Sequence, residues 1–124
     1  MVSAPVASNH GYERQAGVCR ALSHPARLAI LDVLRGGEQC VCHIEAALGL
    51  RQAYISQQLM VLREAGLVSD RRDGWNIFYQ LSDPATSRLI GILNSQAGMP
   101  PRRGRAPRRA EACPCPKCNP EGKQ

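Results

Sequence analysis

Apolar residues recur every three or four positions over two segments in the first third of the chain, which is the spacing of one side of an amphipathic helix. The first segment covers residues 13–22. The second starts at Ser23-His24-Pro25, where proline suits a first helical turn, and it is stopped by Gly36-Gly37. The pattern therefore predicts two helices, the second of them capped at its start by the residues before the proline.

Two further amphipathic segments follow at residues 41–48 and 52–65, and each is ended by a glycine, Gly49 or Gly66. The apolar positions that recur on one side of these segments are Ile44, Ala47, Leu48, Ile55, Leu59 and Leu62. Two helices joined by a tight glycine turn are typical of a helix-turn-helix unit.

A β-hairpin is predicted directly after this unit, because residues 67–71 and 75–81 have the pattern of strands around Arg72-Asp73-Gly74. An Asp-Gly pair between two such segments is a strong hairpin signal. The aromatic residues of the second strand are expected to pack within the hairpin, and they are Trp75, Phe78 and Tyr79.

Asp83 and Pro84 then begin a last helix that runs to about residue 96. A chain of 124 residues is enough for one compact domain and not for two. The order helix, helix, helix-turn-helix, hairpin, helix predicts a mainly α fold with a small β-hairpin wing, which is a winged helix-turn-helix with helices added at each end.

The net charge of +6 is concentrated near the C-terminus. Residues 1–95 hold nine basic and eight acidic side chains, whereas residues 96–124 hold seven basic and two acidic ones. Residues 1–12 and 97–124 are poor in large apolar side chains, so neither segment buries enough surface to offset the entropy of ordering. We therefore expect one folded domain over residues 13–96, nearly neutral, between two disordered segments.

Several classes of protein are excluded by what the sequence lacks. No segment approaches the ~20 apolar residues of a membrane span, and residues 1–18 lack the apolar stretch of a secretory signal. We expect a cytoplasmic protein with reduced thiols and no membrane partner. No Ser/His/Asp constellation, glycine-rich phosphate loop or Cys-x-x-Cys after a βαβ pattern is present, so we expect neither an enzyme nor a binder of small organic substrates.

Polar side chains that suit base reading project from the start of the second helix of the helix-turn-helix unit. They are Gln52, Tyr54, Ser56, Gln57 and Gln58. Glutamine pairs with adenine through two hydrogen bonds, and hydroxyl groups reach phosphates or bases in the major groove. An ordinary solvated helix face is the alternative, but the helices before it and the wing after it favour DNA binding.

Arg71 and Arg72 lie close to the expected tip of the wing. Guanidinium groups there suit contacts with phosphates along the DNA backbone or beside the minor groove. Arginines at a hairpin tip are also commonly only solvated, which is the alternative.

The six cysteines are divided between the folded domain and the C-terminal segment. Cys40 and Cys42 frame one residue at the start of a predicted helix. Side chains at i and i+2 diverge by about 200° inside a regular helix, so the pair shares one ion only if Cys40 lies at or before the helix cap. The dipole of a helix N-terminus favours thiolate, which favours a ligand pair over two buried core cysteines.

Cys113, Cys115 and Cys118 stand within six residues of the C-terminal segment, separated by prolines that forbid a helix. Three thiolates suit a soft ion, with trigonal coordination for As(III) or Pb(II) and tetrahedral coordination for Cd(II) or Zn(II). These cysteines either complete the Cys40 and Cys42 pair or form a separate site. A redox-labile disulfide and an inert tail are the alternatives.

The other candidate ligands are weaker. Cys19 is interpreted as a core residue, His43 as a solvated side chain and His24 as a helix cap. Residues 87–94 of the last helix contain no His, Asp or Glu, so a carboxylate and imidazole site across that helix is excluded. Thiophilic ions are therefore favoured.

Four spaced motifs resemble the ArsR/SmtB family of metalloregulatory repressors. They are ALSHPARLAIL at residues 21–31, EQCVCHI at 38–44, ISQQL at 55–59 and LREAGLV at 62–68. The resemblance covers about residues 13–96. It implies a homodimer joined through its first and last helices, bound to a palindromic operator and released when a metal or metalloid binds.

The resemblance also implies roles for particular residues. Gln52, Tyr54, Ser56 and Gln57 would lie on the recognition helix, and Cys40 and Cys42 would belong to a metal-binding box. The sequence departs from the family pattern at two positions. Gln58 stands where many relatives have histidine, and Glu45 stands where many arsenite-sensing members have a third cysteine.

These features predict a repressor that binds operator DNA as a homodimer. A thiophilic ion, As(III), Sb(III), Cd(II), Pb(II) or Zn(II), would bind cysteine thiolates and release the DNA, in the context of arsenic or cadmium resistance. A thiol-redox-sensing repressor on the same scaffold is the alternative, in which oxidised cysteine pairs release the DNA.

Overall fold

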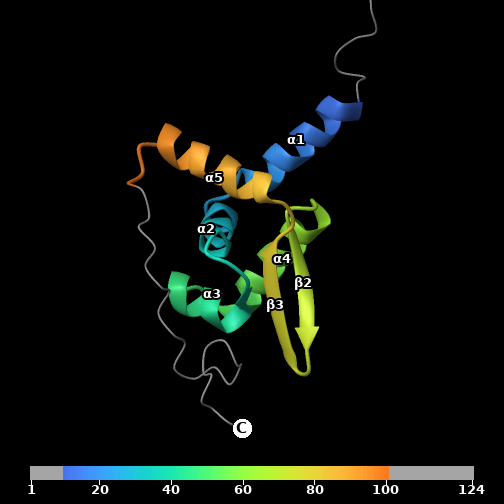
Figure 1. Ribbon diagram of the computed structural model, residues 1–124, viewed down its shortest axis with the longest axis vertical. Coiled ribbons are helices and arrows are strands. Elements are labelled where there is room, and N and C mark those ends of the chain that lie inside the picture. The colour runs from blue at the N-terminus through green and yellow to red at the C-terminus, as the bar shows by residue number, and fades with distance from the viewer. Residues whose placement is uncertain (1–9, 101–124) are drawn as a thin grey trace, which may run out of the picture.

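The computed structural model describes residues 10–100, which form five helices and a three-stranded antiparallel sheet (Figure 1). In chain order the elements are α1 (His10–Leu22), α2 (Pro25–Leu34), β1 (Gln39–Cys40), α3 (Val41–Leu48), α4 (Gln52–Glu64), β2 (Val68–Asp73), β3 (Asn76–Leu81) and α5 (Pro84–Gln96). The predicted winged helix-turn-helix is confirmed. The first helix begins at His10, three residues earlier than expected, and residues 1–9 and 101–124 lie outside the described part.

Side-chain caps explain where α2 and α5 begin. The backbone N–H of Ala26 donates to Nδ1 of His24 at 3.2 Å, and the N–H of Ala85 donates to Oδ1 of Asp83 at 2.7 Å. A proline follows each cap as the first helical residue. The N–H at this position would have no acceptor within the helix, so proline, which has no N–H, costs nothing there. The two helix starts that the sequence predicts are therefore confirmed.

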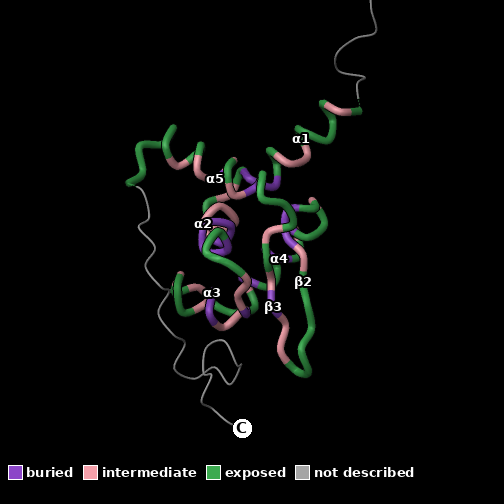
Figure 2. Tube along the Cα trace, viewed as in Figure 1, coloured by how far each residue is buried: buried purple, intermediate pink, exposed green. Residues whose placement is uncertain are grey.

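The core is built mainly from apolar side chains of α2, α3, α4 and α5, with contributions from α1 and the strands. Its fully buried members are Ile30, Leu31, Ile44, Ile55, Leu59, Leu62, Phe78 and Ile90. Burial of such a side chain contributes roughly 1.5–3 kcal/mol, so α4 is held firmly by its inner side. Figure 2 shows buried positions gathered on the inner sides of the helices, while β2 and the tip of the hairpin are largely exposed and β3 is mainly half-buried.

The sheet joins the start of the helix-turn-helix unit to the wing. Its strand order is β1-β3-β2, and Cys40 of β1 is paired with Phe78 of β3. β1 has only two residues, and the sequence did not predict it. In the wing the last pair is Asp73 with Asn76, so the turn consists of Gly74 and Trp75.

The turn explains one wrong prediction. Gly74 has a φ of 63°, a left-handed conformation that glycine adopts without strain. Trp75 therefore occupies the turn and not the strand, and its side chain is fully exposed at 101% of the reference area. The expectation that Trp75 packs in the hairpin is wrong, whereas Phe78 is buried as expected and Tyr79 is half-buried.

The elements are arranged with two distinct ends. α1 and α5 lie together at one end of the molecule, and α3 and the tip of the hairpin lie at the other (Figure 1). α4 starts a few residues after α3 ends, so its N-terminus lies on the same side as α3. None of the helices within residues 10–100 has the length and apolar character needed to cross a membrane.

Candidate DNA-binding face and cysteine site

The first turns of α4 present a polar face to solvent. Gln52, Ser56 and Gln57 are exposed, as the sequence predicts, while Ile55 on the inner side is fully buried. Tyr54 is half-buried at the edge of this face. The N-terminal part of α4 therefore offers amide and hydroxyl groups of the kind that hydrogen-bond to base edges and phosphates.

The hydroxyl of Tyr54 is oriented by the residue that caps α2. Its oxygen lies 3.3 Å from Nε2 of His24, and the two rings are 6.3 Å apart. Because Nδ1 of His24 accepts the Ala26 amide, the neutral ring carries its proton on Nε2 and donates it to the tyrosine oxygen. The hydroxyl hydrogen of Tyr54 is then available as a donor to a group outside the protein.

Gln58 does not belong to this face. Only 8% of its area is exposed, and its Oε1 accepts a 2.9 Å hydrogen bond from Nε of Arg27 on α2. The same guanidinium donates through NH1 to the carbonyl oxygens of Arg20 and Ala21 at the end of α1. The prediction that Gln58 projects outward to read DNA is wrong, because the side chain fastens α4 to α2 and, through Arg27, to α1.

The two wing arginines differ in their surroundings. The guanidinium of Arg71 donates two hydrogen bonds to the carboxylate of Glu38, from NH2 at 2.7 Å and from Nε at 3.0 Å, and it lies 4.8 Å above the ring of Phe78. These hydrogen bonds raise the pKa of Arg71 above its usual value. Arg72 is exposed and makes no ion pair with another described side chain. The sequence does not identify Glu38 as a functional residue, because its position two residues before Cys40 gives no sign of its contact with Arg71.

The two cysteines of the domain core converge at the start of α3. Cys40 is the N-cap residue, with extended backbone angles, and its Sγ accepts the backbone N–H of His43 at 3.4 Å. Its Sγ lies 2.9 Å from Sγ of Cys42, which takes part in a disulfide. The geometric condition that the sequence set, Cys40 at the cap and not inside the helix, is therefore met.

The cysteine pair is joined to the wing by two contacts. Cys40 is paired with Phe78 across the β1–β3 ladder, and Glu38, just before β1, holds Arg71 of β2 above that same Phe78 ring. The backbone at Cys40 is thereby connected to both strands of the wing. We call Glu38, Arg71 and Phe78 the wing clamp.

Other predicted ligands are placed differently from expectation. Cys19 is exposed on α1 and not in the core of the protomer, and His43 is buried, with 6% of its area exposed, and not solvated. Within residues 10–100 no three His, Cys, Asp or Glu side chains gather as a metal site. Cys113, Cys115 and Cys118 lie outside the described residues, so their relation to Cys40 and Cys42 stays a prediction.

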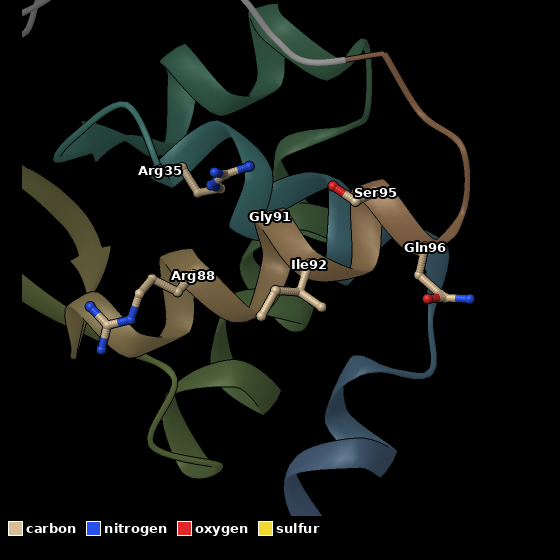
Figure 3. A pocket seen from close by; sticks show the side chains of 6 residues that line it. All are labelled: Arg35, Arg88, Gly91, Ile92, Ser95 and Gln96. Atoms are coloured by element: carbon tan, nitrogen blue, oxygen red, sulfur yellow. The ribbon is translucent and has the colours of Figure 1, made fainter.

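A shallow cleft opens on α5 at the opposite end of the molecule, with a volume of about 500 Å³. It is lined by Arg35, Arg88, Gly91, Ile92, Ser95 and Gln96 (Figure 3). Arg35 reaches from α2 over Gly91, where an added Cβ would come within 2.9 Å of its NH2. Ile92, which lines the cleft, has 65% of its area exposed, and on α1 the large side chain of Tyr12 is 52% exposed.

Comparison with known proteins agrees with this architecture. The sequence model of a family described as "Bacterial regulatory protein, arsR family" matches residues 24–70, from the cap of α2 into β2. A biofilm growth-associated repressor from Agrobacterium fabrum (strain C58 / ATCC 33970) is 49% identical over 74 residues, which are 60% of this chain and 63% of that relative. The chain thus spans slightly less than two thirds of that repressor.

Two further relatives are covered more fully. The nodulation protein NolR of Rhizobium meliloti is 37% identical over 94 residues, 76% of this chain and 77% of NolR. The solution structure of a homodimeric winged helix-turn-helix DNA-binding domain from Mycobacterium bovis, described as a possible ArsR-family transcriptional regulator, is 31% identical with a TM-score of 0.69. The similarity covers 79% of this chain and 91% of that one.

The fold and the polar face of α4 define a winged helix-turn-helix regulator. The chain belongs to the arsR family of bacterial regulatory proteins, which are DNA-binding transcriptional regulators and not enzymes. The resemblance stated from the four sequence motifs and the expectation of a non-enzyme are both confirmed.

Proposed function

We propose that the protein is a repressor that binds operator DNA as a homodimer. In this proposal Gln52, Ser56 and Gln57 read base edges in the major groove, the hydroxyl of Tyr54 donates to a phosphate, and Arg72 binds a phosphate beside the wing. Support comes from the exposure of these groups and from relatives that are named repressors or DNA-binding domains.

We further propose that a thiophilic ion, As(III), Sb(III), Cd(II), Pb(II) or Zn(II), acts as inducer. Cys40 and Cys42 supply two sulfur ligands, and one or more of Cys113, Cys115 and Cys118 complete the set. The observation that carries this proposal is the approach of the two Sγ atoms to 2.9 Å at the N-cap of α3. The N-terminal end of the helix dipole favours the thiolate form that such an ion requires.

The geometry suggests how an ion would weaken DNA binding. Two sulfurs that bind one tetrahedral ion through bonds of about 2.3 Å lie roughly 3.8 Å from each other. The present separation is 2.9 Å and Cys42 is in a disulfide, so this disulfide must be reduced before an ion takes both sulfurs, and ion binding then changes their separation. Since the backbone of Cys40 is paired with Phe78, this movement reaches the wing clamp and shifts the wing relative to α4.

The test is a fluorescence anisotropy titration with duplexes that the protein itself selects from a random-sequence pool, under full reductant. By linkage, an ion that prefers the DNA-free dimer by about 1–3 kcal/mol lowers duplex affinity roughly 5- to 150-fold. The double variant Cys40→Ser plus Cys42→Ser should bind DNA and ignore the ion, while Cys19→Ser, exposed on α1, should respond as the parent does. Release that persists in the double variant contradicts the site.

The same titration separates the redox alternative. A thiol-redox sensor releases DNA on oxidation and rebinds on reduction, and it does not respond to As(III) or Cd(II) under full reductant. Release by oxidant alone would therefore replace the ion by an oxidised cysteine pair as the inducing state.

A further inference from the structure

Trp75 is the most exposed large apolar side chain among the described residues. It is also the only tryptophan of the chain. Its relative exposure of 101% means that the indole packs against no other part of the described structure. Tryptophan ordinarily buries a large apolar area, so this side chain gains nothing from its position within the protomer.

The turn holds Trp75 in a defined place. β2 and β3 are paired up to Asp73 and Asn76, which leaves Gly74 and Trp75 as a two-residue turn. Gly74 adopts a φ of 63°, so the turn is compact and the indole is carried at the very tip of the wing.

The tip lies at the end of the molecule that carries the DNA-reading groups. α1 and α5 lie at the other end, and the whole tip of the hairpin is exposed (Figures 1 and 2). A second copy that packs on α1 and α5 would therefore lie at the end of the molecule away from Trp75. A nucleic-acid partner of α4 is on the same side as the tip.

One guanidinium beside the indole is also available to a polyanion. The acidic groups of the wing have arginine partners: Asp70 lies 3.3 Å from Arg63, and Asp73 lies 3.9 Å from Arg71. Arg72 has no such partner among the described residues and is exposed next to the tip. Arg71 is shared between Asp73 and Glu38, so the local charges balance, and the tip combines one uncovered aromatic ring with one exposed guanidinium that forms no ion pair within residues 10–100.

We propose that Trp75 is a DNA-contacting residue that packs its indole against the sugar edges of the minor groove next to the major groove occupied by α4. Apolar side chains placed in the minor groove, with a cation on the adjacent phosphate, are an established means of holding DNA. Arg72 supplies that cation. The proposal rests on the proposed function, because it requires that the protein bind duplex DNA.

The single tryptophan makes the contact directly measurable. Full-length protein is titrated with a duplex selected by the protein from a random-sequence pool, and tryptophan emission is excited where tyrosine does not absorb. We expect the emission to change in intensity with a midpoint equal to that of the anisotropy of the labelled duplex. We also expect the indole to be open to iodide quenching in the free protein and protected in the complex.

Variants test whether the contact contributes to affinity. Trp75→Ala should weaken duplex binding about tenfold, and Trp75→Phe, which keeps an aromatic ring, should recover most of the loss. Tyr12→Phe is the control at an exposed aromatic residue on α1 at the opposite end, because it keeps the ring in the proposed dimer surface. It should leave the fluorescence response of Trp75 to DNA in place. Circular dichroism checks that each variant is folded.

The outcomes distinguish this inference from the proposed function. If duplexes are selected and bound, but Trp75 emission and iodide access do not change and Trp75→Ala binds as tightly as the parent, the inference is overturned and DNA binding stands. If no duplex is recovered from the pool at low salt, the proposed function itself fails. Protection of Trp75 by DNA together with a loss of affinity in Trp75→Ala supports the contact.

Discussion

Nε of Arg27 on α2 donates a 2.9 Å hydrogen bond to Oε1 of Gln58 on the recognition helix α4, although the two residues stand 31 positions apart in the sequence. Because NH1 of Arg27 also binds two carbonyls at the end of α1, a single guanidinium joins three helices. The outer face of α4 is thus aimed by a polar contact as well as by the apolar core.

Removal of this contact should cost stability. We expect Gln58→Leu to lower the free energy of unfolding by about 1–3 kcal/mol, because it leaves the Nε–H of Arg27 without its acceptor in a half-buried position. Urea unfolding followed by circular dichroism measures the change. Gln57→Leu is the matched control on the exposed face and should stay within roughly 0.5 kcal/mol of the parent. Equal stability of the two variants would contradict the role of Gln58.

A second prediction concerns the wing clamp. Arg71→Ala removes both hydrogen bonds to Glu38 and the contact with Phe78, so the wing loses one of its two contacts with the cysteine pair. We expect the variant to bind an inducing ion as the parent does, measured by thiolate charge-transfer absorption. The fold-change in duplex affinity that the ion produces should nevertheless be several times smaller.

The control for the wing clamp is Arg63→Ala, which removes an ion pair with Asp70 of β2 without touching Glu38. It should keep the full response to the ion. If Arg71→Ala keeps the parent's fold-change as well, the connection between cysteine pair and wing runs only through the β1–β3 pairing.

The alkaline limit of stability should depend on Tyr79. Burial, and secondly the negative charge of Asp70 on the neighbouring strand, raise the pKa of Tyr79 above its usual value. The folded state therefore disfavours the tyrosinate. The contribution of neutral Tyr79 to the free energy of unfolding is complete below about pH 10, and it is lost as the pH rises through the raised pKa. The free energy of unfolding of Tyr79→Phe should fall less steeply than that of the parent between about pH 9 and 11. Tyr12→Phe, at an exposed position, should retain the parent's slope.

Much of the fold is legible in the sequence because its signals are local. Proline after a capping side chain marks the starts of α2 and α5, and glycine marks the turn between α3 and α4. The placement of Cys40 at a cap follows from the same local reasoning. These features need only a few neighbouring residues to be determined.

The errors arise where distant partners decide the outcome. Gln58 lies three residues after Ile55 and four before Leu62, on the buried side of the helix, but its burial depends on Arg27 far away in the sequence. β1 exists only because β3 is beside it. The sequence pattern places Trp75 in the second strand of the hairpin, but the turn extends one residue further and includes it. Such a one-residue shift takes a side chain out of the strand pattern.

The last prediction concerns the dimer, for which we propose an interface of α1 and α5. Both helices lie at the end of the molecule away from the wing tip, and each exposes a large apolar side chain, Tyr12 on α1 and Ile92 in the cleft on α5. Ile92→Asp places a carboxylate in that apolar surface, one helical turn from Arg88, with which it can pair on the same helix. The protomer should therefore stay folded while the dimer dissociates.

Sedimentation velocity measures this result directly. We expect the parent to sediment as a dimer and Ile92→Asp as a folded monomer with greatly weakened binding to a palindromic duplex, because one protomer presents a single α4 to only one half-site. Trp75→Asp introduces the same charge at the exposed wing tip and should remain dimeric. A dimer that survives Ile92→Asp but dissociates when α3 or the wing is altered would place the interface at the opposite end of the molecule.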